Sequence, residues 1–248
     1  MSLELHLAIA ATFALAGLVK GVVGLGLPTV AMGLLGLFMP PAQGAVLLLL
    51  PSLLTNLWQM LPLATLGACL RRLWTLLLGI LAGTVWAPVG LASLDPRIGA
   101  AGLGAALLVY ALLGLATVRL LVPPHWQRWG HPLVGLATGA VTAATGVFVF
   151  PAVPYLQGLG LRKDELVQAL GLNFTVSTVA LAWRLAADGA LTPGALDATA
   201  WLPLLAALLG MGLGQGLRRR LSEVLFRRLF FTGLLLLALH LLWKGLAA

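Results

Sequence analysis

The sequence contains few charged residues and few of the residue types that bind metals or act as nucleophiles. Only 9% of its 248 residues are charged, against roughly a quarter in an average soluble domain. Its single cysteine, Cys69, excludes an intrachain disulfide and a metal cluster held by several thiolates. The four histidines lie far apart, and the motifs HExxH, CxxC, GxSxG and the P-loop do not occur. The sequence therefore predicts no enzyme, no catalytic residue, no metal site and no cofactor.

Acidic residues are the scarcest charged type, and all seven fall in or beside breaks between apolar segments. They are Glu4, Asp95, Asp164, Glu165, Asp188, Asp197 and Glu223. No carboxylate is therefore placed inside an apolar segment as a proton relay or as one of a pair for acid–base catalysis. A cationic substrate would find no counter-charge there, whereas an anion would suit the remaining polar groups.

Long apolar runs dominate the rest of the chain. Hydrophobic residues make up 60% of it and the mean hydropathy is +1.04, so we predict an all-α polytopic membrane protein. The apolar segments cover residues 5–39, 43–66, 73–93, 98–121, 133–161, 165–186, 195–216 and 224–246. Six of them have the length of one membrane-spanning helix, but the first and fifth do not.

The first long segment is interrupted by glycines, and the interruption returns in the second half. Residues 17–28 combine Lys20 with four glycines and a proline. A shift of 122 residues pairs Lys20 with Thr142, Gly24 with Gly146, Thr55 with Ser177 and Asn56 with Thr178. Glycine- or proline-broken apolar segments at matching places in two repeats are typical of a transporter's binding site.

The two long segments are expected to fold as hairpins. Residues 5–39 exceed one crossing, so we place a cut near residues 20–26. The first arm, residues 5–19, would then measure only about 22 Å, which predicts a re-entrant hairpin whose tip lies inside the protein.

The chain then divides into two repeats of five elements each. We predict a first repeat over residues 1–122, a cytoplasmic linker over residues 123–132, and a second repeat over residues 133–248. Because five is an odd number, the second repeat has inverted topology.

The basic residues support the hairpins and set the orientation. With hairpins, one face of the membrane collects Arg71, Arg72, Arg119, Arg128, Arg162, Lys163, Arg218, Arg219, Arg220, Arg227 and Arg228. The other face keeps only Arg97, Arg184 and Lys244. Since cytoplasmic loops carry the excess of Lys and Arg, the first face is predicted to be cytoplasmic and both termini periplasmic.

Substrate-binding candidates in the first half are Lys20 with the backbone at Gly24 and Gly26, followed by Asn56 and Gln59. An ammonium beside unwound N–H groups can hold an anion. The alternative is that Lys20 extends to the cytoplasmic surface. Asn56 and Gln59 share one helical face with Ser52 and Thr55, and they either line a substrate path or form interhelical hydrogen bonds.

The candidates in the second half are Thr145, Gly146, Tyr155, Gln168 and Asn173. Hydroxyl groups replace the cation at this second break, because Thr142 stands where the first half has Lys20. Other glycines are expected mainly to let helices approach closely. These are Gly79, Gly83, Gly99, Gly102, Gly210, Gly212, Gly214 and Gly216.

Several runs together resemble the sulfite exporter TauE/SafE family. They are KGVVGLGLP at 20–28, PSLLTNLWQ at 51–59, TGVFVFPAVPYLQGLGL at 145–161 and RKDELVQALGLNFT at 162–175. The resemblance implies a multi-pass permease of the bacterial inner membrane that moves sulfur-containing anions such as sulfite, thiosulfate or organosulfonates. Val147 and Phe148 depart from the richer glycine motif of the family's second half.

The resulting prediction is a transporter of a small organic or inorganic anion that works by alternating access. Its partners would be this anion and the lipid bilayer, without nucleic acid, and a homodimer stays open. Two alternatives remain at this point, namely an anion channel and a membrane subunit of a larger complex that transports nothing.

Overall fold

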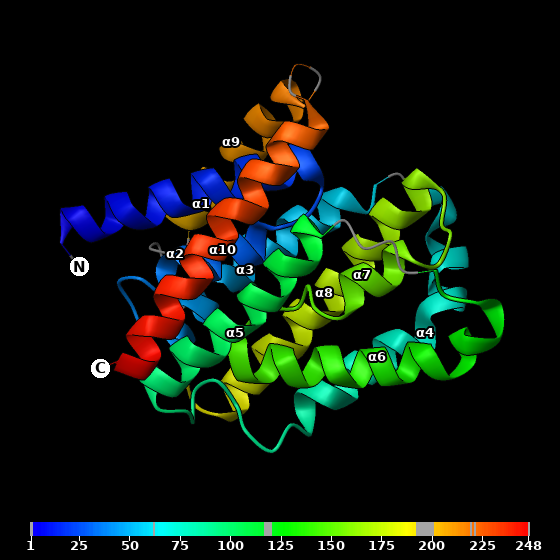
Figure 1. Ribbon diagram of the computed structural model, residues 1–248, viewed down its shortest axis with the longest axis horizontal. Helices are drawn as coiled ribbons and strands as arrows, with labels where there is room; N and C mark the ends of the chain where they lie inside the picture. The colour runs from blue at the N-terminus through cyan, green and yellow to red at the C-terminus, as the bar shows by residue number, and fades with distance from the viewer. Residues whose placement is uncertain are drawn as a thin grey trace.

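The computed structural model describes residues 2–61, 63–116, 121–191, 201–218, 220 and 222–247. All the regular structure among these residues is helical (Figure 1). The helices are α1 Leu3–Val23, α2 Leu27–Leu35, α3 Pro41–Gln59, a short 3-10 turn Leu63–Thr65, α4 Leu66–Val85, α5 Pro96–Leu115, α6 Pro124–Thr145, α7 Ala152–Gln157, α8 Lys163–Ala187, α9 Trp201–Leu217 and α10 Glu223–Ala247. The all-α prediction is confirmed.

Five helices are long and apolar enough to cross a membrane. They are Leu3–Val23, Leu66–Val85, Pro96–Leu115, Lys163–Ala187 and Val224–Ala247. Large apolar side chains cover much of the protein's outside, among them Leu205, Leu209 and Leu236. Such a surface suits a hydrocarbon environment and would be unstable in water.

Both predicted interruptions are helix ends at left-handed glycines. Helix α1 stops at Gly24, whose φ is +81°, and α2 starts after Gly26, whose φ is +104°. Helix α6 stops in the same way at Gly146, whose φ is +70°. A side chain at these φ values is strained, so glycine is what lets the helix end there. The 122-residue shift also relates the first residues of α3 and α8, Pro41 and Lys163.

The predicted length of the first arm was wrong. Residues 5–19 were expected, but α1 continues through Lys20 and Gly21 to Val23. Its 21 residues measure about 30 Å, enough for a full crossing. Helix α1 continues because Lys20 and Gly21 keep helical geometry, and only Gly24 takes the left-handed conformation that stops it. The short arms are instead α2 and α7, with 9 and 6 residues.

Most of the residues assigned to a linker between the repeats, 123–132, are helical. Helix α6 begins at Pro124, so most of residues 123–132 form its first turns. Proline is favoured at the first position of a helix because its missing N–H is not needed there. Arg119, Arg219, Asp197 and the start of the segment at 195–216 lie outside the described residues.

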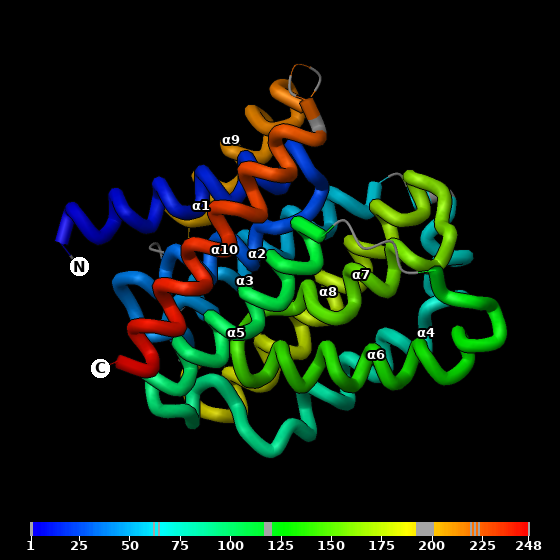
Figure 2. Tube along the Cα trace, in the orientation of Figure 1, coloured from blue at the N-terminus to red at the C-terminus, as the bar shows by residue number. Residues whose placement is uncertain are grey.

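Three helix pairs surround a central crossing of α3 and α8. Helix α1 packs along α9, α6 packs along α4, and α5 packs along α10, as Figure 2 shows. Glycines allow the close approach of α1 to α9 and of α6 to α4. A Cβ on Gly21 of α1 would lie only 2.3 Å from the carbonyl oxygen of Met211 on α9. A Cβ on Gly139 of α6 would lie 2.3 Å from the carbonyl oxygen of Ile80 on α4. The prediction that glycines mediate close approach is confirmed for Gly79, Gly83, Gly210 and Gly214 and wrong for Gly212 and Gly216, which have open space beside them.

Candidate functional site

Lys20 lies inside the protein. Its side chain is only 1% exposed, and its ammonium Nζ donates a hydrogen bond to Thr55 Oγ1 at 3.1 Å and another to Asn56 Oδ1. The Thr55 hydroxyl in turn donates to the carbonyl oxygen of Pro51 at 2.7 Å, which leaves a lone pair facing Lys20. The alternative in which Lys20 extends to the cytoplasmic surface is therefore wrong.

The polar residues around Lys20 connect three helices. The Asn56 amide donates to Ser52 Oγ at 3.2 Å, and Ser52 Oγ lies 3.1 Å from Thr178 Oγ1 on α8. Of the two alternatives for Asn56, the structure shows interhelical hydrogen bonding, and Asn56 is not among the residues that line the cavity described next. All members of the group are buried, so the network holds Asn56 Oδ1 in a fixed orientation towards the ammonium.

A cavity of about 400 Å³ opens beside Lys20. It is lined by Lys20, Gly21, Gly24, Trp58, Gln59, Leu61, Val167, Met211, Gln215 and Arg218. Three of the predicted binding residues, Lys20, Gly24 and Gln59, thus meet at one place although Gln59 is distant in sequence. Gly26 does not line the cavity, and a Cβ on it would lie 3.3 Å from side-chain atoms of Val19 and Phe230.

Gln59 joins the broken segment to the central helices. Its amide nitrogen donates to the carbonyl oxygen of Gly24 at 2.9 Å and to that of Val167 at 3.2 Å. Its buried oxygen Oε1 has no hydrogen-bond partner among the described residues. Gln59 therefore fixes the position of the glycine break against α3 and α8 from within the cavity wall.

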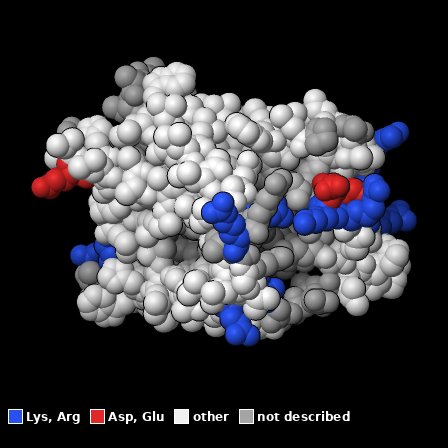
Figure 3. Space-filling view, turned by 90° about the horizontal axis from the view of Figure 1, so that it is seen from above, with Lys and Arg blue, Asp and Glu red and all other residues white. Residues whose placement is uncertain are grey.

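The cavity is electrostatically suited to an anion. Lys20 and Arg218 contribute two cations, and the described lining residues include no carboxylate. Gln59 and Gln215 add amide groups. Figure 3 shows more Lys and Arg than Asp and Glu side chains on the face of the protein that is seen from above. A cation with little competing negative charge attracts anions into a low-dielectric site.

The second-half candidates do not join this cavity. Thr145 Oγ1 accepts a hydrogen bond from the N–H of Val147 at 3.2 Å, and the Asn173 amide donates to the carbonyl oxygen of Phe148 at 3.4 Å. Thr145, Gly146 and Asn173 therefore lie together at the second break, and their role in substrate binding stays a prediction.

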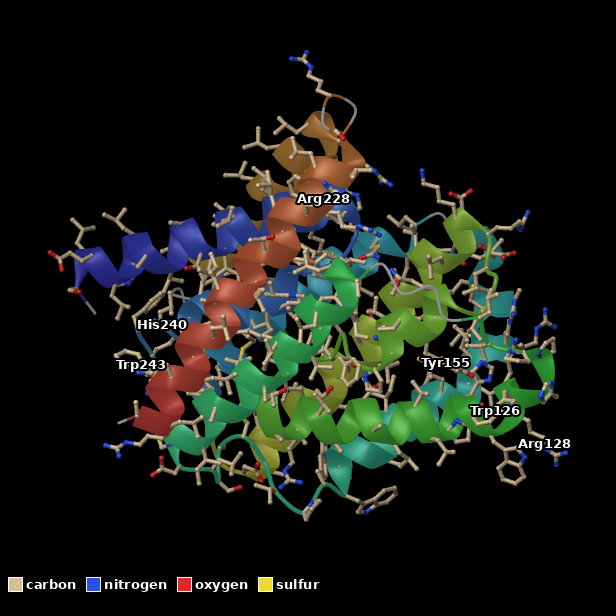
Figure 4. The ribbon with its side chains drawn as sticks, in the orientation of Figure 1. Trp126, Arg128, Tyr155, Arg228, His240 and Trp243 are labelled. Atoms are coloured by element: carbon tan, nitrogen blue, oxygen red, sulfur yellow. The ribbon has the colours of Figure 1, made fainter. Side chains whose placement is uncertain are left out.

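Gln168 and Tyr155 lie elsewhere. Gln168 accepts from Thr65 Oγ1 at 2.5 Å and donates to the carbonyl oxygen of Met60 at 3.1 Å, which ties α8 to the end of α3. Tyr155 packs edge-on against His131, with ring centroids 5.6 Å apart. Figure 4 shows Tyr155 on the same side of the view as Trp126, in the first turn of α6.

Sequence reasoning missed Trp58, Met211, Gln215 and Arg218. Gln215 and Arg218 lie at the end of α9, in a stretch that was interpreted only as helix packing and a cytoplasmic loop. They reach the cavity because Gly210 and Gly214 bring α9 against α1: a Cβ on Gly214 would lie 2.2 Å from the carbonyl oxygen of Leu18. The matching small-residue spacing of Gly17 and Gly21 on α1 was the available signal.

These features define a polytopic helical membrane protein with a buried cation beside a cavity whose described lining residues include no carboxylate. The chain belongs to the Sulfite exporter TauE/SafE family, whose model matches residues 9–241. No curated protein and no solved structure matched the chain. Membership of this family agrees with a transmembrane anion transporter, and it confirms the resemblance seen in the sequence.

Proposed function

We propose that the protein carries a small anion across the bacterial inner membrane and that the cavity beside Lys20 binds it. The observation that carries the proposal is the burial of the Lys20 ammonium next to a cavity without a carboxylate among its described lining residues. A buried cation is costly unless something compensates it. An anion bound beside Lys20 would supply that compensation, in addition to the neutral acceptors Thr55 and Asn56.

The proposed substrate class is a sulfur oxyanion such as sulfite, thiosulfate or an organosulfonate. The family name points to this class, and the donor groups around the cavity suit it. Charge-assisted hydrogen bonds from Lys20 and Arg218 would reach the sulfonyl or sulfite oxygens, while Gln59 and Gln215 add neutral polar contacts. Trp58, Leu61 and Met211 would face an organic portion where the anion has one.

We further propose that the two halves are inverted repeats that alternate access to the site. Three observations support this. Helix α1 of the first half packs on α9 of the second, and the equivalent helix of the second half, α6, packs on α4 of the first. The breaks at Gly24 and Gly146 share one geometry. Helix α1 runs from left to right in Figure 1, whereas Trp126 and Arg128 place the start of α6 at the right in Figure 4.

A second cavity at the other end of α2 fits this mechanism. It has a volume of about 340 Å³ and is lined by residues that include Gly36, Arg97 and Lys244. The first cavity reaches Gly24, just before α2, and the second reaches Gly36, just after it. In the proposed cycle the anion would pass between these cavities as α1 and α2 move against the central pair of α3 and α8.

The orientation predicted from the basic residues can be tested by cysteine labelling. In a Cys69→Ala background, Ser2→Cys is expected to react with a membrane-impermeant maleimide in intact spheroplasts, because both termini are proposed to be periplasmic. Ser222→Cys, between α9 and α10, is expected to react only after the inner membrane is permeabilised. Both positions are exposed. The reverse labelling pattern would overturn the proposed orientation.

Anion binding can be tested by thermal unfolding of the purified protein with sulfite, thiosulfate, sulfoacetate, sulfate and small carboxylates. A ligand at 100 times its dissociation constant stabilises the folded state by about 2.7 kcal/mol, which corresponds to a rise in Tm of about 5 °C or more. We expect selective stabilisation by a sulfur oxyanion.

Two arginines provide a matched pair for this measurement. Both arginines are exposed, but Arg218 lines the cavity and the nearby Arg220 does not. Arg218→Gln is expected to weaken anion stabilisation, and Arg220→Gln is expected to leave it unchanged. Equal effects of the two variants would mean that general positive charge, and not this cavity, attracts the anion.

A further inference from the structure

The two halves present equivalent positions at their breaks, but only the first half carries a cation there. The N–H of Gly24 donates to the carbonyl oxygen of Lys20 at 2.7 Å, and the N–H of Gly146 donates to that of Thr142 at 2.9 Å. Lys20 and Thr142 therefore occupy the same place relative to the helix end. The Thr142 hydroxyl bonds within its own helix, donating to the carbonyl oxygen of Thr138 at 2.7 Å.

The acceptors that face Lys20 in the first half have counterparts in the second. Helices α3 and α8 begin 122 residues apart, so Thr55 corresponds to Ser177 and Asn56 to Thr178. Lys20 donates to both Thr55 and Asn56. Thr178 instead bonds to Ser52. Ser177 Oγ is fully buried and has no hydrogen-bond partner among the described residues.

A second unpartnered oxygen lies one helical turn away. Asn173 Oδ1 is also fully buried and has no partner in the described part of the chain. Asn173 and Ser177 are four residues apart on α8 and share one face. The amide nitrogen of Asn173 donates to the carbonyl oxygen of Phe148, which places this face against the second break. Buried acceptors without a donor are rare and need an explanation.

We propose that Asn173 Oδ1 and Ser177 Oγ, with backbone carbonyl groups of the second break, bind a sodium ion. In the first half, the Lys20 ammonium brings a positive charge to buried acceptors on α3. The sodium ion would bring a positive charge to the buried acceptors on α8 in the second half. Unwound backbone and hydroxyl oxygens at a broken helix are suitable ligands for Na⁺.

The chemistry of the ligands selects among possible ions. Neutral oxygens without a carboxylate suit a hard monovalent cation better than Ca²⁺ or Mg²⁺, which prefer carboxylate ligands. The acidic side chains in the described part of the chain lie near helix ends, away from the middle of α8. A proton is excluded as the bound ion because asparagine and serine do not titrate in the physiological range.

The consequence for transport rests on the proposed function. Inward movement of an anion is opposed by the negative potential of the cell interior. A sodium ion that moves with a monovalent anion cancels this charge, so the proposed site would allow sodium-coupled import. The binding of sodium itself does not depend on that function and can be measured without any transported anion.

The test is thermal unfolding of the purified full chain in NaCl, KCl and choline chloride at equal ionic strength, which holds chloride constant. We expect Na⁺ to raise Tm in a saturable way and K⁺ and choline to do so much less. Ser177→Ala should raise the half-saturating Na⁺ concentration at least about tenfold, since even outer-sphere changes cost that much in metal affinity. Thr175→Ala is the matched control, because Thr175 lies on the same helix but bonds to the carbonyl oxygen of Gly171.

Ser177→Cys provides a second variant should the alanine protein fail to fold, since it keeps the volume and replaces a hard oxygen with a soft sulfur. Equal stabilisation by the three salts, or an unchanged Na⁺ response in the Ser177 variants, would overturn the site and assign these oxygens to a bound water molecule. A Na⁺ response without any anion response would support the cation site while contradicting the proposed function. An anion response without a Na⁺ response would support the proposed function and contradict the sodium site.

Discussion

Replacement of Lys20 by methionine is expected to abolish anion-dependent stabilisation while the protein stays folded. Methionine has a similar length and no charge, so it can occupy the space of the lysine side chain. Leaving a buried charge without its partner costs about 3–5 kcal/mol. An anion bound in the Lys20→Met cavity would lack its buried cationic partner, so its binding free energy should weaken by about this amount. The apparent dissociation constant should therefore rise more than about a hundredfold.

The free energy of unfolding of the ligand-free Lys20→Met protein should rise or stay unchanged, although anion binding weakens. Lys20 is buried with only neutral acceptors, Thr55 and Asn56, so its removal relieves the cost of burying a charge. The loss of its donors leaves Asn56 Oδ1 unpaired, at about 1–3 kcal/mol, which offsets that gain. Tm without anion should thus be similar to or above that of the parent protein.

Lys163→Met is the control for this prediction, because it makes the same chemical change at an exposed position that does not line the cavity. Thermal unfolding across an anion titration measures both proteins in the same way. An unchanged anion affinity in Lys20→Met would remove Lys20 from the site. A similar loss in Lys163→Met would show that surface charge, and not the buried ammonium, attracts the anion.

The second large effect is expected on stability, from Gly210→Ala. A Cβ on Gly210 would lie 2.1 Å from the carbonyl oxygen of Ala14, and backbone atoms cannot move aside as a flexible side chain can. Helices α1 and α9 would have to separate, which we expect to destabilise the protein by about 1–3 kcal/mol. Because Lys20 and Gln215 line the cavity from these two helices, anion binding should weaken as well.

Gly212→Ala is the matched control two residues away in the same helix. A Cβ on Gly212 meets nothing within 4 Å, and alanine is the better helix former by about 1 kcal/mol. This variant should therefore unfold at the same Tm or a higher one. Equal Tm values for Gly210→Ala and Gly212→Ala would contradict the close contact between α1 and α9.

Much of the architecture could be predicted because it depends on local chemistry. The breaks at Gly24 and Gly146 were predictable, since only glycine accepts the left-handed conformation that stops these helices. Lys20, Asn56 and Gln59 were identified because polar residues inside apolar segments are costly and therefore need a role. The length of the first arm was not predictable, because helix formation tolerates Lys20 and Gly21 and ends only at Gly24.

The sequence by itself determined that this is a helical membrane protein, where its helices break, and that a cation stands at the first break and a hydroxyl at the second. Only the tertiary structure decided that the Lys20 ammonium points to Thr55 and Asn56 instead of to the protein surface, and that Gln215 and Arg218 share its cavity. The physical reason is that glycines on α1 and α9, nearly the whole chain apart, set how closely these helices pack. Periodicity within one segment contains no information about which other segment will meet it.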